Sequence, residues 1–327
     1  MSSSARARVG VVGFGRWGRN LARNFHAIGC LAGLCDSDPD HLRAAADTYP
    51  AARAFPQSEA LIRSGDVDAV AIATPAGTHH ELAASALTAG LHVFVEKPMT
   101  TDLAAARTLV VQARAAGLQL VTGHLLHYHP AFETLQAMVH DGRLGALRGI
   151  VTSRLTSGPE TPREHVIWEF APHDIAMILA CADELPLSVC CFRPDSESNG
   201  PSAAHTRVEL AFSSGLRSQT TVSWRGHAKV QRFEVEGNVA TAVFDDVAPA
   251  GSKLTLAPTG QPPSPVPVPD REPLASECAA FVEAVATGVA PPSGADEGLR
   301  VMTVLDACFR SLEERRTVPL QIPENGG

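Results

Sequence analysis

The feature that most constrains the fold is a glycine motif near the start of the chain. It reads Gly13-Phe14-Gly15-Arg16-Trp17-Gly18 and lies between an apolar run over residues 8–12 and a helical pattern over residues 17–28. The first glycine allows a tight turn, the second lets the backbone approach a pyrophosphate, and the third lets helix and strand pack closely. The N-terminus of the helix would face the phosphate charge. This order of elements predicts a dinucleotide-binding unit.

An acidic residue at the end of the second apolar run indicates which dinucleotide fits. Asp36 stands eighteen residues after Gly18 and directly follows residues 31–35. A carboxylate there can accept hydrogen bonds from both hydroxyls of the adenosine ribose, and it repels a 2′-phosphate. The next residues, Ser37 and Asp38, offer no arginine that could receive such a phosphate. The sequence therefore predicts NAD rather than NADP as the cofactor.

The hydrophobic pattern changes along the 327 residues, and a chain of this length can hold two domains. In the first third, short apolar runs alternate with helical patterns, which is typical of a doubly wound parallel sheet. Strands are predicted over residues 8–12, 31–35, 69–73, 92–96 and 119–122, and helices over 17–28, 39–48, 78–89 and 101–116. Asp102 is expected to cap the last of these helices and Gly117 to end it. We expect an α/β Rossmann domain over residues 1–124.

The remaining residues, 125–327, are predicted to form an α+β domain for the substrate. Helices are expected over 131–141, from near Pro172, over 275–287 and over 296–315, and strands over 147–156, 187–193, 206–213, 216–225, 229–237 and 240–246. Several of these strands alternate polar and apolar residues, which favours a large, mostly antiparallel open sheet with one solvated face. A proline-rich loop is expected over 258–272.

Composition excludes several classes of function. The chain has 27 Lys and Arg against 35 Asp and Glu, so it lacks the basic field that nucleic-acid binding needs. Its longest uncharged apolar run, residues 175–182, is far shorter than the roughly 20 residues that cross a membrane. The first residues lack the apolar segment of a secretion signal. Seven cysteines without a Cys-x-x-Cys pair are typical of buried thiols, so we expect a cytoplasmic protein.

Polar residues also stand at the ends of two further predicted strands. The run 69–73 leads into Thr74, Pro75 and His79, and the run 92–96 leads into Glu96-Lys97-Pro98. Ligands of an open parallel sheet bind beyond the carboxyl ends of its strands, so Lys97 would face the nicotinamide side. An ammonium group there can stabilise charge on a carbonyl or alkoxide oxygen during hydride transfer. The alternative is a solvated lysine at a strand end.

Four elements of the sequence occur together: the glycine motif, Ala73-Thr74-Pro75 followed by His79, Glu96-Lys97-Pro98, and later His173-Asp174. In this combination the chain resembles the glucose–fructose oxidoreductase / inositol dehydrogenase family, called Gfo/Idh/MocA. The resemblance implies an NAD-dependent dehydrogenase or ketoreductase that acts on sugar CH–OH groups. It implies that Lys97 lies by the nicotinamide and the substrate, with Thr74, Pro75, His79, Glu96 and Pro98 at the cofactor. A homo-oligomer, dimer or tetramer, is also implied.

The same resemblance implies that His173 is the catalytic acid/base and that Glu169, four residues earlier, assists it. Because proline is suited to the first turn of a helix, Pro172 predicts that His173 lies at a helix N-terminus, where the partial positive charge favours a neutral ring. A histidine that only decorates a helix start is the alternative. The family more often has Asp or Asn where Glu169 stands, which leaves the role of this longer side chain open.

Two segments indicate a branch of the family. Trp168-Glu169-Phe170-Ala171-Pro172-His173-Asp174 and Gly123-His124 with Tyr128-His129-Pro130-Ala131 resemble enzymes acting on nucleotide-linked sugars. The implied substrate-binding residues are Lys97, His124, Tyr128, Trp168 and His173. His124 and Tyr128 are equally well explained as packing residues. The alternative functions are a free polyol, inositol or aldose dehydrogenase, and a non-catalytic NAD-binding regulatory protein.

His124, His127 and His129 are close enough in sequence to suggest ligands of a metal ion. Zinc serves other alcohol dehydrogenases, but no cysteine or carboxylate stands beside these histidines at ligand spacing. The sequence therefore predicts no metal.

Overall fold

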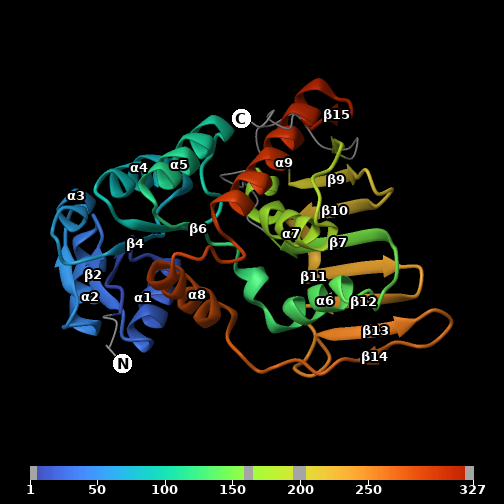
Figure 1. Ribbon diagram of the computed structural model, residues 1–327, viewed down its shortest axis with the longest axis horizontal. Helices are drawn as coiled ribbons and strands as arrows, with labels where there is room; N and C mark the ends of the chain where they lie inside the picture. The colour runs from blue at the N-terminus through green and yellow to red at the C-terminus, as the bar shows by residue number, and fades with distance from the viewer. Residues whose placement is uncertain (1–5, 158–164, 194–203, 321–327) are drawn as a thin grey trace. The chain divides into compact units, whose positions relative to one another are not determined.

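The computed structural model describes residues 6–157, 165–193 and 204–320. The chain divides into two compact units (Figure 1): the first unit is Met1–Tyr128 with Arg271–Met302, and the second unit is His129–Asp270 with Thr303–Gly327. The predicted boundary between residues 124 and 125 is close to the first crossing between the units. The return of residues 271–302 to the first unit was not predicted.

The first unit contains a parallel sheet, as predicted, with six strands where five were expected. Its strands are β1 (Val9–Val12), β2 (Leu31–Cys35), β3 (Arg53–Phe55), β4 (Ala69–Ile72), β5 (His92–Val95) and β6 (Leu120–Thr122), in the order β3-β2-β1-β4-β5-β6. β1 and β4 are buried along their whole length because helices cover both faces of the sheet. β3 was missed, since three residues are too few to show a hydrophobic period.

The helices of the first unit include the four that the sequence predicts between its strands, and a short helix over Ser58–Ile62 that was missed. They are α1 (Arg16–Ala27), α2 (Pro39–Thr48), α3 (Ser58–Ile62), α4 (His79–Thr88), α5 (Leu103–Ala116) and α8 (Pro273–Thr287), with short 3₁₀ turns η1 (Ala76–Thr78) and η2 (Leu125–Tyr128). Asp102 caps α5, because its carboxylate accepts from the Ala105 amide at 2.8 Å. Gly117 ends α5 with a φ of 67°. Both predictions are confirmed.

Helix α8 shows why the predicted division of the chain was wrong at its C-terminal end. Phe281 of α8 is fully buried, and its ring lies 6.3 Å from that of Phe25 in α1 and 5.8 Å from that of Phe94 in β5. Leu274 and Cys278 belong to the same hydrophobic core. The apolar face of α8 is therefore buried in the core of the first unit.

The second unit is built on a nine-stranded sheet. Its strands are β7 (Leu147–Ser157), β8 (Ser188–Phe192), β9 (His205–Ala211), β10 (Arg217–Ser223), β11 (Arg225–Gly237), β12 (Ala240–Asp245), β13 (Leu254–Pro258), β14 (Ser264–Pro265) and β15 (Val318–Pro319). Their order is β14-β13-β12-β11-β7-β10-β9-β8-β15, with β7 and β10 parallel and the other neighbouring pairs antiparallel. This confirms the predicted α+β class. Strand β13 and the short strands β14 and β15 were not predicted.

Three further helices are α6 (Pro130–His140), α7 (Val166–Ala182) and α9 (Ala295–Glu314). Helix α7 packs on β7, β9 and β10 and also contacts α6. In Figure 1, α6 and α7 are drawn in green beside the sheet strands of the second unit. Eleven residues of α7 are buried, which fits a helix that is apolar around most of its circumference.

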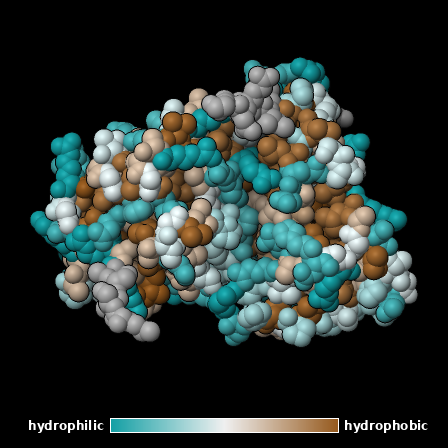
Figure 2. Space-filling model, in the orientation of Figure 1, coloured by the Kyte–Doolittle hydropathy of each residue, from teal (hydrophilic) through white to brown (hydrophobic). Residues whose placement is uncertain are grey.

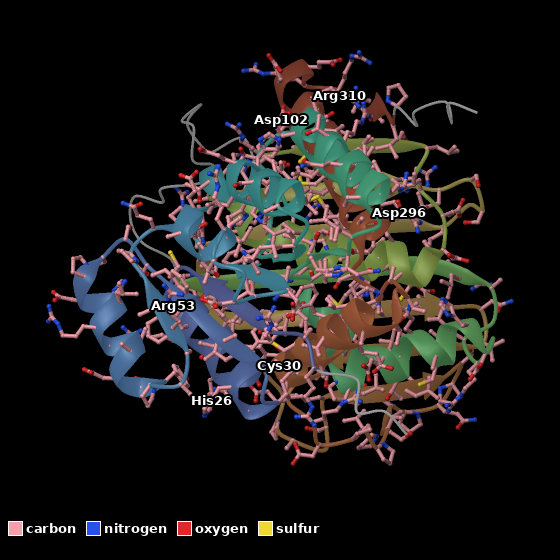
Figure 3. The ribbon with its side chains drawn as sticks, turned by 60° about the vertical axis from the view of Figure 1, so that its left-hand side comes forward. His26, Cys30, Arg53, Asp102, Asp296 and Arg310 are labelled. Carbon is pink, nitrogen blue, oxygen red and sulfur yellow. The ribbon has the colours of Figure 1, made fainter. Side chains whose placement is uncertain are left out.

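The cysteines and the surface agree with the composition. All seven cysteines are free thiols; Cys190 is half-buried and the other six are buried. Figure 3 labels Cys30, which lies between α1 and β2, and His26 in the last turn of α1. Figure 2 shows hydrophobic residues interspersed among hydrophilic ones on the visible face. Within the described ranges, none of the helices has the length and apolar character to cross a membrane.

Candidate active site

A pocket of about 770 Å³ lies in the first unit, at the carboxyl ends of β1, β2 and β4. Five of the predicted cofactor residues line it: Gly13, Gly15, Asp36, Thr74 and Pro75. A pocket at this edge of a doubly wound sheet is where dinucleotides bind. The lining residues that sequence reasoning missed include Asp38, His41, Gln57, Ser58, Glu59 and Glu81.

The glycine motif leaves no room for side chains at two of its three glycines. Gly13 has a φ of +92°, and a Cβ there would stand 2.8 Å from the carbonyl oxygen of Ala73. A Cβ at Gly18 would overlap the carbonyl of Gly13, so any larger residue would force α1 away from β1. At Gly15 the space is open. Because α1 begins here and its first turn holds no carboxylate, its amide groups suit an anion.

The Asp36 carboxylate has a structural function in addition to the predicted contact with the ribose. Its Oδ2 accepts from the Phe14 amide at 2.6 Å, and its Oδ1 accepts from the Asp38 amide at 2.8 Å. The carboxylate therefore ties the glycine motif to the start of α2. His41 Nδ1 also lies 3.3 Å from Asp36 Oδ2, so this imidazole shares the ribose end of the pocket.

We expect the protein to bind NAD at least a hundredfold more tightly than NADP. Asp36, Asp38 and Glu59 all line this pocket, so a 2′-phosphate would meet like charges there, an unfavourable interaction of about a few kcal/mol. In Asp36→Asn the charge is lost while one amide oxygen remains for the Phe14 amide. The ratio of the NADP and NAD dissociation constants, measured by titration calorimetry, should fall about tenfold or more.

Asp40→Asn is the matched control, because Asp40 is exposed on α2 and pairs with Arg43 at 3.0 Å. It removes the same charge without touching the pocket and should leave the ratio unchanged. Equal affinity of the wild type for the two cofactors would contradict the assignment of Asp36.

The remaining residues of the glycine motif are not in the pocket wall. Phe14 is buried against Tyr49, with ring centroids 6.3 Å apart, and Arg16 is exposed. Trp17 is half-buried, and its indole Nε1 donates to the carboxyl group of Glu96. This bond links the glycine motif to the end of β5, which carries Lys97.

His79 joins the two other strand ends. Its ring is 1% exposed, with Nδ1 2.8 Å from the carbonyl oxygen of Pro98 and Nε2 2.9 Å from that of Thr74. Thr74 Oγ1 in turn lies 2.7 Å from Thr78 Oγ1. His79 therefore holds the segments after β4 and β5 together. The predicted cofactor contact of His79 would be made through these segments, not by the ring itself.

Glu96 and Lys97 differ in burial although they are neighbours. Glu96 is buried, and its Oε2 accepts from the Lys97 amide at 3.3 Å. Burial raises the pKa of Glu96 to about 7, against the opposing effects of Trp17 and of the Lys97 charge. Lys97 is half-buried. Glu96 thus supports the segment that holds Lys97, and its carboxyl group is buried away from the pocket.

The predicted substrate residues His124 and Tyr128 are packed inside the first unit. His124 is 2% exposed, with Nδ1 2.7 Å from Glu297, and the Tyr128 hydroxyl lies 2.8 Å from Ser293 Oγ. Their burial supports the packing interpretation that the sequence left open. Glu297 stands 173 residues from His124, at the start of α9, and no local pattern indicated this pairing.

The three histidines that suggested a metal site, His124, His127 and His129, lie in two separate groups. His127 Nε2 lies 3.0 Å from Glu297, which also binds His124, whereas His129 Nε2 lies 3.3 Å from Asp246 in the second unit. Burial raises the pKa of Glu297, but the two imidazoles outweigh it and hold the pKa at about 2. Among the residues that the structure describes, no group of three or more His, Cys, Asp or Glu side chains is arranged to hold a metal ion. The absence of a metal requirement stays a prediction.

Helix α7 places His173 differently from the prediction. The helix begins at Val166, and His165 caps it, because His165 Nδ1 accepts from the Ile167 amide at 3.2 Å. Burial lowers the pKa of His165 to about 4, so the ring stays neutral and its Nδ1 can accept. Pro172 lies inside the helix, and His173 is seven residues from its start. The prediction that His173 stands at a helix N-terminus is wrong, and the dipole there does not reach it.

The pairing of Glu169 with His173 gains support from the same helix. Glu169 is in the first turn and exposed, His173 is half-buried, and residues four apart lie on one face of a helix. Trp168 stacks on Phe309 of α9, with centroids 4.9 Å apart and ring planes 25° apart. Trp168 is therefore held in place by an aromatic neighbour on its own unit.

Family comparisons cover most of the chain. Residues 7–124 match GFO_IDH_MocA, an oxidoreductase family with an NAD-binding Rossmann fold. Residues 132–243 match the GFO/IDH/MocA C-terminal domain. A protein of Magnetospirillum magnetotacticum described as an oxidoreductase is 31% identical, with a TM-score of 0.83 over 93% of this chain and 100% of the other.

Individual relatives are named for different substrates. The UDP-N-acetylglucosamine 3-dehydrogenase of Acidithiobacillus ferrooxidans is 36% identical over 185 residues, which span 56% of each chain. Its solved structure superposes with a TM-score of 0.85 over 94% of this chain and 98% of the other, at 27% identity. The inositol 2-dehydrogenase of Rhizobium meliloti is 25% identical over 96% of this chain and 99% of its own.

Proposed function

The chain belongs to the Gfo/Idh/MocA oxidoreductase family, and from this premise we propose that it transfers a hydride between NAD and a ring CH–OH group of a nucleotide-linked sugar. The observation that carries the proposal is the carboxyl edge of the parallel sheet. There the neighbouring strands β2, β1, β4 and β5 are followed by Asp36, the glycine motif, Thr74 and Lys97.

The choice of a nucleotide-linked sugar is supported by two observations. The segment from Trp168 to Asp174 resembles that branch of the family, and a relative with 36% identity oxidises UDP-N-acetylglucosamine according to its name. A free polyol is the second candidate, because inositol dehydrogenases match the chain over nearly its whole length. The two candidates differ in whether a nucleotide is recognised.

The reaction requires that one carbon lose a hydride and that its hydroxyl lose a proton. NAD supplies the hydride acceptor when it is bound. Lys97 would hold the sugar oxygen and stabilise its developing negative charge, and an imidazole nitrogen of His173 would take the proton. Glu169, one turn away on α7, would orient the imidazole or stabilise its charged form.

A substrate panel tests the proposal. The purified protein is mixed with NAD and, in separate reactions, with UDP-N-acetylglucosamine, UDP-glucose, dTDP-glucose, myo-inositol and D-glucose, and NADH absorbance is followed. We expect turnover with at least one nucleotide-linked sugar and a kcat/KM at least about a hundredfold above that of any free sugar, because the nucleotide adds binding energy. UDP alone should inhibit competitively.

Other results would reassign the substrate or the function. Turnover with myo-inositol but not with the nucleotide-linked sugars would favour the second candidate. NAD binding without turnover of any compound, in either reaction direction, would favour a regulatory protein. The family resemblance also supports a homo-oligomer in the cytoplasm, and light scattering would contradict this state if it returned the mass of one chain.

A further inference from the structure

A buried ion pair joins α7 to the sheet of the second unit directly beside the proposed acid/base. Arg154 of β7 contacts Asp174 of α7 through two donors, with Nε 3.0 Å from Oδ2 and Nη2 3.4 Å from Oδ1. Arg154 is 8% exposed and Asp174 is 1% exposed. Asp174 is the residue after His173, so this pair holds the turn of the helix that carries the histidine.

The guanidinium is held from its other side as well. Gln231 of β11 is the cross-strand partner of Arg154. With its amide oxygen directed at Arg154 Nη1, the two atoms are 3.1 Å apart, and its amide nitrogen then donates to Asp246 Oδ2 at 3.1 Å. Asp246 also donates its backbone amide to the carbonyl of Gln231 at 2.9 Å. Helix α7 and strand β11 therefore both restrain one arginine of β7.

Asp246 ends the network and is itself doubly bound. Its Oδ1 accepts from Lys253 Nζ at 2.7 Å and lies 3.3 Å from His129 Nε2. His129 Nδ1 accepts from the Ala131 amide at 3.1 Å as the cap of α6, which leaves Nε2 as the donor to Asp246. The hydrogen bond from His129, followed by that from Lys253, holds the pKa of Asp246 below its usual range. Asp246 therefore stays charged at this end of the network.

Helix geometry connects this network to the direction of the His173 ring. Successive side chains on an α-helix are about 100° apart, so fixing Asp174 toward the sheet also fixes the direction of His173 and of Glu169, one turn earlier. Apart from Asp174, the buried residues of α7 are apolar, and hydrophobic packing has no directional preference. Pro172 cannot donate a backbone hydrogen bond to Trp168, so the helix is less restrained just before His173.

We propose that Arg154 is a positioning residue: by clamping Asp174 it sets the rotation of α7 and thereby aims the His173 imidazole. The consequence for turnover rests on the proposed function, whereas the effect on the ring itself does not. A small misplacement of a reacting group lowers turnover by up to about a hundredfold. The ion pair would thus act on the chemical step and leave NAD binding unchanged.

Two variants distinguish an effect on the position of the His173 ring from an effect on the stability of the protein. Arg154→Lys keeps the charge but cannot form the paired contact with Asp174. The double variant Arg154→Met with Asp174→Leu removes both buried charges together, a change that proteins often tolerate without loss of stability. The double variant has no carboxylate at position 174. An effect that both variants share therefore does not come from a buried carboxylate left without its partner.

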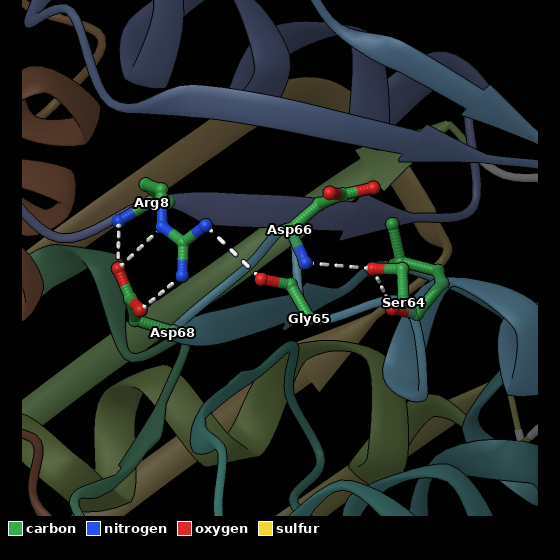
Figure 4. A network of polar contacts seen from close by, with 6 residues as sticks. Arg8, Ser64, Gly65, Asp66 and Asp68 are labelled. Atoms are coloured by element: carbon green, nitrogen blue, oxygen red, sulfur yellow. Dashed lines mark hydrogen bonds and ion pairs between the residues drawn. The ribbon is translucent and has the colours of Figure 1, made fainter.

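The chain offers a matched control in its first unit. Arg8 and Asp68 form the same paired contact, with Nε 3.1 Å from Oδ2 and Nη2 2.7 Å from Oδ1, and both side chains are exposed (Figure 4). They lie just before β1 and β4, at the amino ends of the strands and opposite the pocket edge. Arg8→Lys makes the identical chemical change where no positioning role exists.

The first measurement needs no substrate. Each protein is labelled with diethyl pyrocarbonate, and peptide mass spectrometry gives the labelling rate of His173 relative to exposed His227. In both Arg154 variants we expect this relative rate to change at least threefold, and in Arg8→Lys to stay at the wild-type value. An unchanged rate in the folded double variant overturns the proposal, and so does a change confined to Arg154→Lys.

The second measurement is turnover with the most active sugar of the panel. We expect kcat to fall about tenfold to a hundredfold in both Arg154 variants, with the dissociation constant of NAD unchanged. A lower melting temperature with wild-type kcat would show a purely structural ion pair and overturn the proposal. If His173→Ala retains full turnover, the acid/base assignment fails, while the labelling rates still decide whether Arg154 aims the ring.

Discussion

Lys97→Ala is expected to lower kcat by about a thousandfold or more. The substitution removes a contact to the substrate oxygen and the charge that stabilises a developing alkoxide, and loss of one such donor costs about 10²–10³ in kcat. Lys97→Arg should not restore turnover, because the guanidinium is larger and cannot give up a proton. Steady-state kinetics with the most active sugar of the panel, together with an NAD titration, measures both parts of this expectation.

Lys229→Ala provides the matched control for this prediction. The chain has three lysines, and Lys229 is exposed on β11 of the second unit. Its removal should change neither kcat nor the dissociation constant of NAD. Turnover of Lys97→Ala within a few fold of wild type would show that the residue after Glu96 does not have the role implied by the family. Loss of NAD affinity without loss of kcat would assign Lys97 to cofactor binding alone.

Local patterns predicted the elements of the fold well where the elements are long. The predicted strand over residues 31–35 has the bounds of β2, and the predicted helix over 39–48 has those of α2. Asp38 before Pro39 is a strong helix start, and its carboxylate accepts from the Asp40 amide at 2.8 Å. Short elements such as β3 lack a repeat long enough to be recognised.

Such local patterns do not predict which elements pack against each other. The apolar face of α8 predicts burial, but it does not say that Phe281 packs on Phe25 and Phe94 and not on the second sheet. The start of α7 shows a different failure. Pro172 is favoured in a first turn, yet the tertiary fold continues the helix back to Val166, where His165 supplies the cap.

In the candidate site, too, local motifs were predicted and contacts between distant residues were not. Gly13, Gly15 and Asp36 follow from a motif with fixed spacing, and the structure places all three in one pocket. The contacts that support the site join distant residues: Trp17 with Glu96, His124 with Glu297, and Arg154 with Asp174. A single sequence shows each of these residues but carries no signal of the pairing.

His173→Ala is expected to lower kcat by about 10²–10⁴ while the dissociation constant of NAD barely changes. A group that moves a proton contributes in the transition state, and His173 belongs to the second unit, whereas the NAD pocket is formed by the first. The loss of kcat/KM on the acid side, where a general base becomes protonated, should disappear in this variant. Glu169→Gln should have a smaller effect and shift the pH profile of kcat/KM more than its plateau.

Because His173 lies inside α7 and not at its N-terminus, the partial positive charge of the helix dipole does not act on its ring, and Glu169 is the charged neighbour on the same helix face. Glu169 would then favour the charged imidazole, so Glu169→Gln should move the acid limb of the profile to lower pH. His227→Ala, an exposed imidazole on β11, is the matched control and should leave the profile unchanged. Near-wild-type turnover of His173→Ala would show that another group moves the proton, and a limb that moved to higher pH in Glu169→Gln would show that Glu169 does not act on the ring by charge.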